Sequence, residues 1–369
     1  MARAVVLDRP LGTYSVQEFP IPEPAPGSVL LRMELSGCCA TDLHTYLGHW
    51  PTNFPTLPGH ENVGRVEKVG PGGARDYLGR ELQVGDRVFA RWGWCGTCYE
   101  CRTLRQPRRC RNRPVSSDGV VEPFSGGFAE LLYLNAPATT FMLKMDAPAT
   151  TVVLSEPLGV AVTAVRRAQP KLGDTVIVQG SGAIGLLTLG LAKLGGASRV
   201  ICVGAPARRL EVARSFGADA VIDIEAMREP EERRRAVLAE TPFGIGADIV
   251  FGCVGVASAW EEGITFVRDE GCFMELGLAA DAGSLQFNPA IQLVARNLTF
   301  KGTLGLSDYA DAVVAGRILE QGQLPFGDVV SHQLPLERVG DAIEALNSNY
   351  RIDGQTALKI TIAPNGPIA

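Results

Sequence analysis

The sequence has no surplus of positive charge and no long block of basic residues. Its 35 lysines and arginines are outnumbered by 40 acidic residues, and the net charge is −5. Proteins that bind nucleic acids usually carry a basic patch or stripe. Here the densest basic stretch, Arg102 to Arg113, is interrupted by Cys110. The composition therefore gives no support to a nucleic-acid partner.

Long apolar runs are also missing. A membrane-spanning helix needs about 20 consecutive apolar residues, and Arg3 and Asp8 interrupt the first residues before a signal-length run develops. The nine cysteines are an odd number, and without an export signal they suit a reducing compartment better than disulfide pairing. We therefore expect a cytoplasmic protein without a membrane partner.

Neither internal repeats nor low-complexity tracts occur, and 369 residues exceed what one hydrophobic core usually supports, so two domains are expected. Up to about residue 155, short apolar runs broken by proline and glycine predict a β-rich region. Its expected strands include Val29–Leu35, Arg87–Ala90 and Phe128–Leu134.

From Asp174 onward, apolar strand-like runs alternate with helix-like segments, which is typical of an α/β domain with a parallel sheet. The expected strands are Thr175–Val178, Val200–Val203, Ala220–Ile224, Asp248–Phe251, Cys272–Leu276 and Leu298–Phe300. The C-terminal region predicts a helix, a strand, a second helix and a last strand, and we expect it to pack on the first domain. These elements are Tyr309–Gln321, Val329–Leu334, Leu336–Leu346 and Ala357–Ile362.

Four closely spaced cysteines stand out in the β-rich part, at positions Cys95, Cys98, Cys101 and Cys110. Zinc favours four thiolates in a tetrahedral array, and two-residue gaps let successive sulfur atoms converge on one ion. Such a site has no open position for a substrate. The spacing therefore predicts a structural zinc that holds a loop in place.

A glycine-rich turn follows the strand at Thr175–Val178. It reads Gly180-Ser-Gly182-Ala183-Ile184-Gly185 and leads into a helix expected at Leu186 to Leu194. Between a strand and a helix, this GxGxxG pattern indicates a dinucleotide site, where the helix N-terminus receives the pyrophosphate.

The end of the second strand of this domain carries information about the cofactor. An acidic residue there would bind the ribose 2′-hydroxyl of NAD, but the sequence has Gly204, followed by Arg208 and Arg209. Guanidinium groups favour a 2′-phosphate. NADP is therefore favoured over NAD; the alternative is that both arginines lie on a solvated helix face.

A second metal constellation precedes the four cysteines. Cys39 and His60 are plausible zinc ligands on separate turns, and Glu61 or Glu156 could be the third. Three protein ligands with an open fourth position are typical of a catalytic zinc. Three of the four histidines fall between residues 44 and 60, a clustering unusual for core histidines.

Taken together, these motifs make the chain resemble the zinc-dependent medium-chain dehydrogenase/reductase superfamily, in particular the alcohol, sorbitol and threonine dehydrogenases. The resemblance extends nearly from end to end. Besides the four cysteines and the Gly180 turn, it is carried by Gly37-x-Cys39-x-Thr41-Asp42-x-His44, Gly59-His60-Glu61-x-x-Gly64, Gly85-Asp86-Arg87-Val88 and Gly126-Gly127-Phe128-Ala129-Glu130.

The resemblance implies a GroES-like catalytic domain and a Rossmann domain. The catalytic domain would take residues 1–160, with the structural zinc lobe at about 92–113. The Rossmann domain would take residues 161–305, and residues 306–369 would return to the catalytic domain. A homodimer or homotetramer is the usual assembly in this superfamily.

The resemblance also implies roles for single residues. Cys39, His60 and either Glu61 or Glu156 would hold the catalytic zinc, and Asp42 would fix the His60 tautomer. Thr41 would take the proton of the substrate hydroxyl and pass it through the cofactor ribose towards His44. Lys359 matches the position where the family often places a cation on the pyrophosphate.

The expected activity is zinc-dependent, NAD(P)-linked hydride transfer between the nicotinamide and an alcohol or its carbonyl, with a secondary, cyclic or polyol substrate. Epimerisation through transient oxidation, double-bond reduction and a catalytically silent NADP-binding sensor are the alternatives. Four aromatic residues near the ligand segments could line an apolar pocket, or they could be ordinary core or surface residues: Trp50, Phe54, Trp92 and Phe124.

Overall fold

The computed structural model describes residues 1–92, 94–104, 106, 109–112, 122–135, 140–306, 308–348 and 350–368, without the Trp92 side chain. The chain divides into two compact units. Unit 1 comprises Met1–Glu156 and Asp308–Ala369, and unit 2 comprises Pro157–Ser307. The first boundary lies inside helix α4 (Ser155–Ala168). Within the described residues, no helix is long and apolar enough to cross a membrane.

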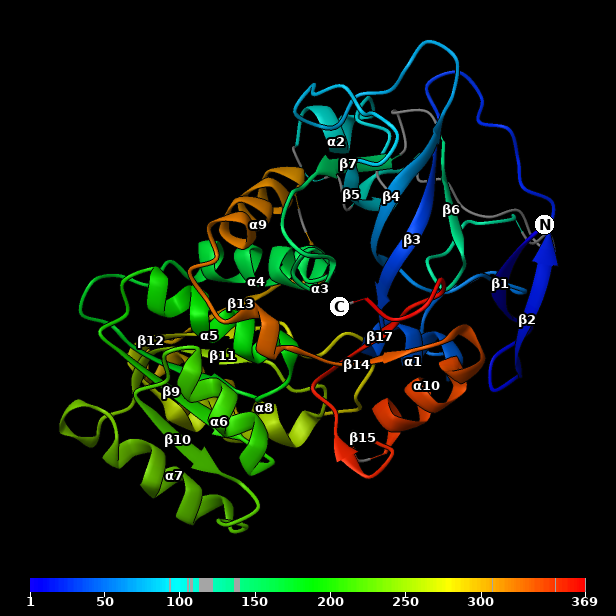
Figure 1. Ribbon diagram of the computed structural model, residues 1–369. Helices are drawn as coiled ribbons and strands as arrows, with labels where there is room; N and C mark the ends of the chain where they lie inside the picture. Colours follow the sequence, from blue (N-terminus) through cyan, green and yellow to red (C-terminus); the bar gives the residue numbers. More distant parts are fainter. Residues whose placement is uncertain are drawn as a thin grey trace. The chain divides into compact units, whose positions relative to one another are not determined.

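Unit 1 is built around a seven-stranded, mostly antiparallel sheet (Figure 1). Six strands follow one path in the order β14 (Val330–Leu334), β17 (Lys359–Ile362), β3 (Val29–Gly37), β4 (Glu61–Val69), β5 (Arg87–Trp92) and β7 (Thr140–Lys144), and β6 (Leu131–Leu134) pairs with β3. The hairpin of β1 (Ala2–Leu7) and β2 (Tyr14–Phe19) lies outside this sheet. The described helices of the unit are α1 (Ala40–Tyr46), α2 (Tyr99–Arg102), α3 (Ala149–Val152), α9 (Tyr309–Gln321) and α10 (Val339–Asn347).

The register of three of these strands brings distant segments of unit 1 together. Gly37, the last residue of β3, pairs with Glu61 at the start of β4 and with Thr361 in β17. The backbone N–H of Cys38 donates to the carbonyl of Ile360 at 2.9 Å. The segment after β3, the segment before β4 and the beginning of β17 therefore meet at one end of the sheet.

Unit 2 has a six-stranded parallel sheet with the strand order of a doubly wound fold. The order is β10 (Ala220–Asp223), β9 (Arg199–Gly204), β8 (Thr175–Gln179), β11 (Ala247–Gly252), β12 (Val267–Glu275) and β13 (Thr299–Gly302). Helices α5 (Ala183–Leu194), α6 (Ala207–Ser215), α7 (Pro230–Ala239) and α8 (Ala257–Gly263) separate the strands along the chain. Ligands bind in such sheets beyond the carboxyl ends of the strands, where the order reverses beside β8.

The α/β class with a β-rich part and a parallel sheet is confirmed, and the differences from expectation are local. A short helix, α1, forms where a turn was expected after β3. The strand expected at Phe128–Leu134 is shorter, because Ala129 bridges Ala4 and the regular ladder begins at Leu131. The expected helix at Leu336–Leu346 begins as a 3-10 turn, and α10 proper starts at Val339.

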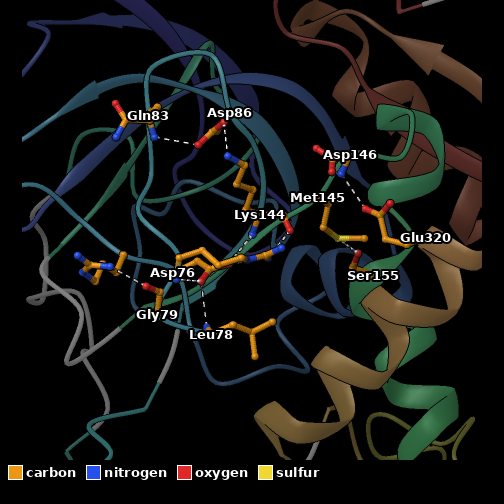
Figure 2. A network of polar contacts seen from close by, with 12 residues as sticks. Asp76, Leu78, Gly79, Gln83, Asp86, Lys144, Met145, Asp146, Ser155 and Glu320 are labelled. Carbon is orange, nitrogen blue, oxygen red and sulfur yellow. Dashed lines mark hydrogen bonds and ion pairs between the residues drawn. The ribbon is translucent and has the colours of Figure 1, made fainter.

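Polar contacts tie helix α9 to the segment that follows β7. Figure 2 shows the Glu320 carboxylate directed at the backbone of Asp146. Its Oε1 accepts from the N–H groups of Asp146 and Ala147 at 2.7 and 3.2 Å. At the last residue of β7, the side chain of Asp76 accepts from the N–H of Lys144 at 3.1 Å. Residues near 76, 145 and 320 are thereby joined within unit 1.

Candidate functional site

Cys39 is the residue that caps the start of helix α1, and hydrogen bonds with the first turn of the helix hold it in place. Its Sγ accepts from the N–H of Thr41 at 3.2 Å, and its own N–H donates to Asp42 Oδ2 at 3.0 Å. This reciprocal pattern is a capping box, which satisfies the free N–H groups at a helix start. It also directs the thiol and the Asp42 carboxylate to the same end of the helix.

The same end of α1 meets His60. The Cys39 Sγ and the His60 Nε2 are 3.2 Å apart, and His60 Nδ1 lies 3.4 Å from Asp42 Oδ1. Asp42 is almost fully buried, whereas the His60 side chain keeps 29 % of its surface exposed. One ring nitrogen thus faces the thiol and the other a carboxylate. This is the usual arrangement of a metal-binding histidine and its supporting carboxylate.

Glu61 forms a buried ion pair with Lys359, the first residue of β17. The ammonium donates to Glu61 Oε1 at 2.6 Å and to the carbonyl of Cys38 at 2.9 Å. Burial lowers the pKa of Lys359, but the Glu61 and Cys39 charges outweigh it and raise that pKa overall. A Cβ at Gly37 would lie 2.0 Å from Glu61 Oε2, so glycine makes room for this carboxylate.

Glu156, near the start of α4, is the second carboxylate beside His60. One oxygen each of Glu61 and Glu156 and a His60 ring nitrogen lie within 4.8 Å of one another. Glu156 Oε1 also accepts from Arg91 Nη1 at 3.1 Å. Both candidate third ligands are therefore near His60, and each has a cationic partner.

The donor set fits a zinc ion. In a tetrahedral zinc site with Zn–S near 2.3 Å and Zn–N near 2.0 Å, a thiolate and an imidazole nitrogen lie roughly 3.5 Å apart, close to the 3.2 Å between Cys39 and His60. The surroundings also favour positive charge at His60. Burial lowers its pKa, but Cys39 and Asp42 raise that pKa well above its usual value.

Thr41 and His44, the expected proton-transfer residues, both lie on α1, three positions apart and so on one face of the helix. The Nδ1 of His44 is buried and has no hydrogen-bond partner among the described residues. Burial, together with the nearby His49, lowers the pKa of His44. Its imidazole is therefore neutral at pH 7 and can accept a proton.

The four cysteines of the expected structural zinc site come together. Their sulfur atoms lie within 4.8 Å of one another. Backbone N–H groups of Cys98 and Cys95 donate to Cys95 Sγ and Cys110 Sγ at 3.3 and 3.4 Å. Hydrogen bonding from Thr97 is the main cause that lowers the pKa of Cys95 to about 5. Residues 93, 105, 107, 108 and 113 of the expected lobe lie outside the described part of the chain.

The glycine-rich turn of unit 2 has the close packing that its pattern predicts. Gly182 precedes the first residue of α5, whose first turn contains Ala183, Ile184 and Gly185. A Cβ at Gly185 would lie 1.8 Å from the carbonyl oxygen of Gly180. At Gly182 no atom lies within 4 Å of such a Cβ, so this side of the turn is open to a ligand.

The structure explains why Gly204 stands at the end of β9. A Cβ there would lie 2.5 Å from Ser181 Oγ, which itself donates to the carbonyl of Ala205 at 2.8 Å. Arg208 is exposed and pairs with Glu211 at 3.0 Å. Arg209 is buried, with 6 % of its surface exposed. Of the two candidate arginines, only Arg208 presents its side chain to solvent.

The aromatic candidates do not form one group. Phe124 is fully buried in a core cluster with Leu30 and Leu131, so of its two interpretations the structure supports that of an ordinary core residue. Trp50 and Phe54 are half-buried, and the Trp92 side chain is not described. Arg91 was not among the residues expected at the site. The available signal was one charged residue inside the apolar run Val88 to Trp92.

Comparison with known proteins agrees with this architecture. Residues 25–147 match the alcohol dehydrogenase GroES-like domain, and residues 183–316 match the zinc-binding dehydrogenase family. The 5-exo-hydroxycamphor dehydrogenase of Pseudomonas putida is 30% identical over 346 residues, covering 91% of this chain and 93% of the relative. The erythritol/L-threitol dehydrogenase of Mycolicibacterium smegmatis is 29% identical, covering 95% and 94%.

Solved structures extend the match. An alcohol dehydrogenase of Thermotoga maritima has a TM-score of 0.87 at 29% identity, with 99% of both chains covered. A zinc-binding dehydrogenase of Sinorhizobium meliloti 1021 bound to NADP has a TM-score of 0.81 at 27% identity, again with 99% of both chains covered. The chain therefore belongs to the zinc-dependent medium-chain dehydrogenase/reductase superfamily and is an oxidoreductase that acts on CH–OH groups with zinc and a nicotinamide cofactor.

Proposed function

We propose that the chain interconverts a secondary, cyclic or polyol alcohol with its carbonyl compound, at a site that contains Cys39, His60 and Asp42. The contact of 3.2 Å between Cys39 Sγ and His60 Nε2, with Asp42 behind the ring, is the observation that carries the proposal. A zinc ion held there would act as a Lewis acid on the substrate oxygen.

Glu156 is the better candidate for the third ligand. The Glu61–Lys359 pair is almost completely buried, with 2 % and 5 % of the side chains exposed, and breaking it would leave a buried ammonium without its counterion. The Glu156–Arg91 pair is more open, with 10 % and 18 % exposed. A carboxylate also has two oxygens, so Glu156 can keep Arg91 on one and use the other for a metal.

Thr41 and His44 are proposed to manage the hydroxyl proton. The Thr41 hydroxyl can accept one hydrogen bond while it donates another, so it suits a group that receives the substrate proton. His44 is on the same face of α1, and burial, which lowers its pKa, keeps it neutral and able to accept that proton. General-base transfer of this kind typically contributes about 10²- to 10⁴-fold in rate.

NADP is proposed as the preferred cofactor, with its pyrophosphate at the turn from Gly180 to Gly185. A side chain at Gly204 would meet Ser181, so the acidic residue that binds the NAD ribose cannot be accommodated at that position. Arg208 is the exposed cation closest in sequence to this strand end. Contact of Lys359 with the pyrophosphate stays a prediction. In the structure, the Lys359 ammonium donates to Glu61 and to the carbonyl of Cys38.

The substrate class rests on the relatives as well as on the site. The two curated relatives described above act on a cyclic alcohol and on four-carbon polyols, according to their names. The cyclic alcohol and the polyols both carry their hydroxyl groups on carbons with uncharged substituents. Epimerisation and a silent sensor role are not favoured, because these relatives are dehydrogenases and Thr41 and His44 are both present.

Two further expectations belong with this function. A homodimer or homotetramer and a cytoplasmic location are proposed. Light scattering of the purified protein measures the assembly.

The test is anaerobic absorbance at 340 nm with a panel of primary, secondary, cyclic and polyol alcohols, with NAD and NADP in parallel. We expect reduction of NADP that is lost on treatment with a zinc chelator and returns when zinc is restored. The Cys39→Ser and His60→Ala variants should not reduce NADP, although both should retain the zinc of the four-cysteine site. Silence from protein that binds both zinc and cofactor would contradict the proposal.

A further inference from the structure

Arg91 is an unusual residue for the position that it occupies. It lies on β5, where it pairs with Phe141 of β7, and only 18 % of its side chain is exposed. Of its donors, Nη1 reaches Glu156 Oε1 at 3.1 Å. The Nε is buried and has no hydrogen-bond partner among the described residues. An unmet buried donor costs about 1–3 kcal/mol, more when it is charged.

Arg87 provides an internal comparison four residues earlier on the same face of β5. Its Nε and Nη2 contact both oxygens of Glu34 at 2.6 and 2.9 Å, and its Nη1 donates to the carbonyl of Ala147 at 2.6 Å. Each of its three nitrogens therefore has a partner. A structural arginine on this strand is satisfied within the protein, and Arg91 is not.

The guanidinium of Arg91 is also held in place. It lies 5.7 Å from the ring centre of Trp94, a distance typical of a cation–π contact. The Trp94 ring in turn lies against the Tyr309 ring in a tilted arrangement, with ring centres 4.1 Å apart, and the backbone N–H of Trp94 donates to the Tyr309 hydroxyl at 2.6 Å. The guanidinium is therefore held in a fixed direction, and a ligand that reaches the exposed part of this side chain costs little conformational freedom of the protein.

The charges around the site favour a neutral acceptor for this donor. Cys39, Asp42, Glu61 and Glu156 carry four negative charges when ionised, and Lys359 and Arg91 with a divalent metal balance them. A carboxylate on the substrate would leave a net negative charge in a poorly solvated place. A hydroxyl or carbonyl oxygen can accept from Arg91 and, as a hydroxyl, donate to Glu156.

We propose that Arg91 is a specificity-determining residue that donates to a second, uncharged oxygen of the substrate, so that the site favours an alcohol with a neighbouring oxygen over the matching monoalcohol. This inference rests on the proposed function, because it places the reacting hydroxyl at Cys39 and His60. A site that offers such a donor discriminates against an analogue without the oxygen, since the buried group is then left unpaired.

The experiment compares wild-type protein with Arg91→Met in holoenzyme, on two matched pairs: trans-1,2-cyclohexanediol with cyclohexanol, and 2,3-butanediol with 2-butanol. For Arg91→Met we expect kcat/KM on the diols to fall about 10- to 100-fold, mainly through KM, and kcat/KM on the monoalcohols to fall less, since those substrates lose only the effect of the Arg91–Glu156 contact. Arg91→Lys, which keeps a charge, should recover part of the preference. Arg87→Met is the matched control, which should lower the melting temperature but leave the diol preference intact.

Two readouts separate the ways in which the proposal can fail. An equal loss on diols and monoalcohols, with weaker zinc binding in a chelator competition, would mean that Arg91 only positions Glu156, and would overturn the proposal. Calorimetric binding of the same compounds to the protein with zinc and cofactor needs no turnover. A diol preference that Arg91→Met removes there would support Arg91 even if the proposed reaction were absent, and no preference in the wild type would refute it.

Discussion

The buried carboxylate of Asp42 contacts both Cys39 and His60 and so positions two of the proposed metal ligands. One oxygen accepts the N–H of Cys39 and the other faces Nδ1 of His60. The same side chain thus fixes the start of α1, where the thiol lies, and the orientation of the imidazole. At the scale of a single residue, the geometry of the site depends on this group as much as on the ligands.

Asp42→Asn should weaken the catalytic metal site without unfolding the helix. The amide keeps an oxygen for Cys39 N–H but loses the charge that holds the His60 proton on Nδ1. Loss of such a supporting partner typically costs about 10- to 100-fold in metal affinity or activity. Zinc content after graded chelator treatment measures the effect.

The control for this prediction is Asp76→Asn. Asp76 is another buried carboxylate, which accepts from backbone N–H groups of Leu78, Arg80 and Lys144, remote in sequence from the ligands. The Asp76→Asn variant should lower the free energy of unfolding and leave the zinc affinity unchanged. Equal zinc affinity in Asp42→Asn and wild type would show that His60 is oriented without Asp42.

At the scale of elements, a few strand ends and helix ends carry most of the site. The end of β3, the start of β4 and the start of β17 bring Cys39, His60 and Lys359 together through the pairing of Gly37 with Glu61 and Thr361. The start of α4 adds Glu156, and β5 adds Arg91. Helix α9 contacts the segment after β7 through Glu320.

Glu320→Ala should loosen the junction between α9 and the segment after β7. Its carboxylate receives two backbone N–H groups in an exposed setting (Figure 2), so we expect a loss of about 1 kcal/mol in the free energy of unfolding. Glu320→Gln keeps an acceptor oxygen and should lose less. Denaturant unfolding, with hydrogen exchange at residues 146 and 147, measures both.

If Glu320→Ala and Glu320→Gln exchange at the same rate as wild type at Asp146 and Ala147, these bonds do not hold the segment in solution. The activity of both variants should stay near that of wild type. In the described part of the chain, Glu320 contacts none of the residues proposed to bind the metal.

At the scale of the molecule, stability should depend on pH through a buried carboxyl group of unit 2. In unit 2, burial raises the pKa of Glu275, at the end of β12, to about 7. Its Oε1 accepts from the N–H groups of Gly277 and Leu278 at 2.6 and 2.8 Å, which opposes the shift but does not cancel it. The folded protein therefore holds a proton that the unfolded chain releases.

The consequence for stability has a definite sign. In the unfolded chain Glu275 ionises near the ordinary glutamate pKa of 4.5, while in the folded protein the group stays neutral up to about 7. Stability is therefore lost as pH rises through this window and levels off above it, by up to about 3 kcal/mol at 1.4 kcal/mol per unit of pKa. Glu275→Gln does not titrate, so its melting temperature relative to wild type should rise from pH 4.5 to 7 and then stay constant.

Differential scanning calorimetry at several pH values checks this prediction. Glutamine retains an acceptor for Gly277 and Leu278, so the loop after β12 should keep its bonds at all pH values. A melting-temperature difference that does not change with pH would mean that Glu275 titrates normally in the folded protein.

The local features of the site could be predicted from the sequence because each depends on a short motif. The four-cysteine spacing and the turn from Gly180 to Gly185 depend on neighbours within a few residues. So does the alternation of strands and helices after Asp174. Bond geometry over such short distances leaves few alternatives, and the fold class followed from the same local periodicities.

Only the tertiary structure decided which distant groups meet. Lys359 lies 298 positions from Glu61, and Glu156 lies 65 positions from Arg91, yet each pair forms an ion contact. Likewise, Gly204 has no room for a side chain because Ser181 packs against it, and Phe124 belongs to a core rather than a pocket wall. These outcomes depend on strand register and packing, which are properties of the whole chain. Short-range spacing determines what a segment can bind, and the packed sheet determines which charge stands beside it.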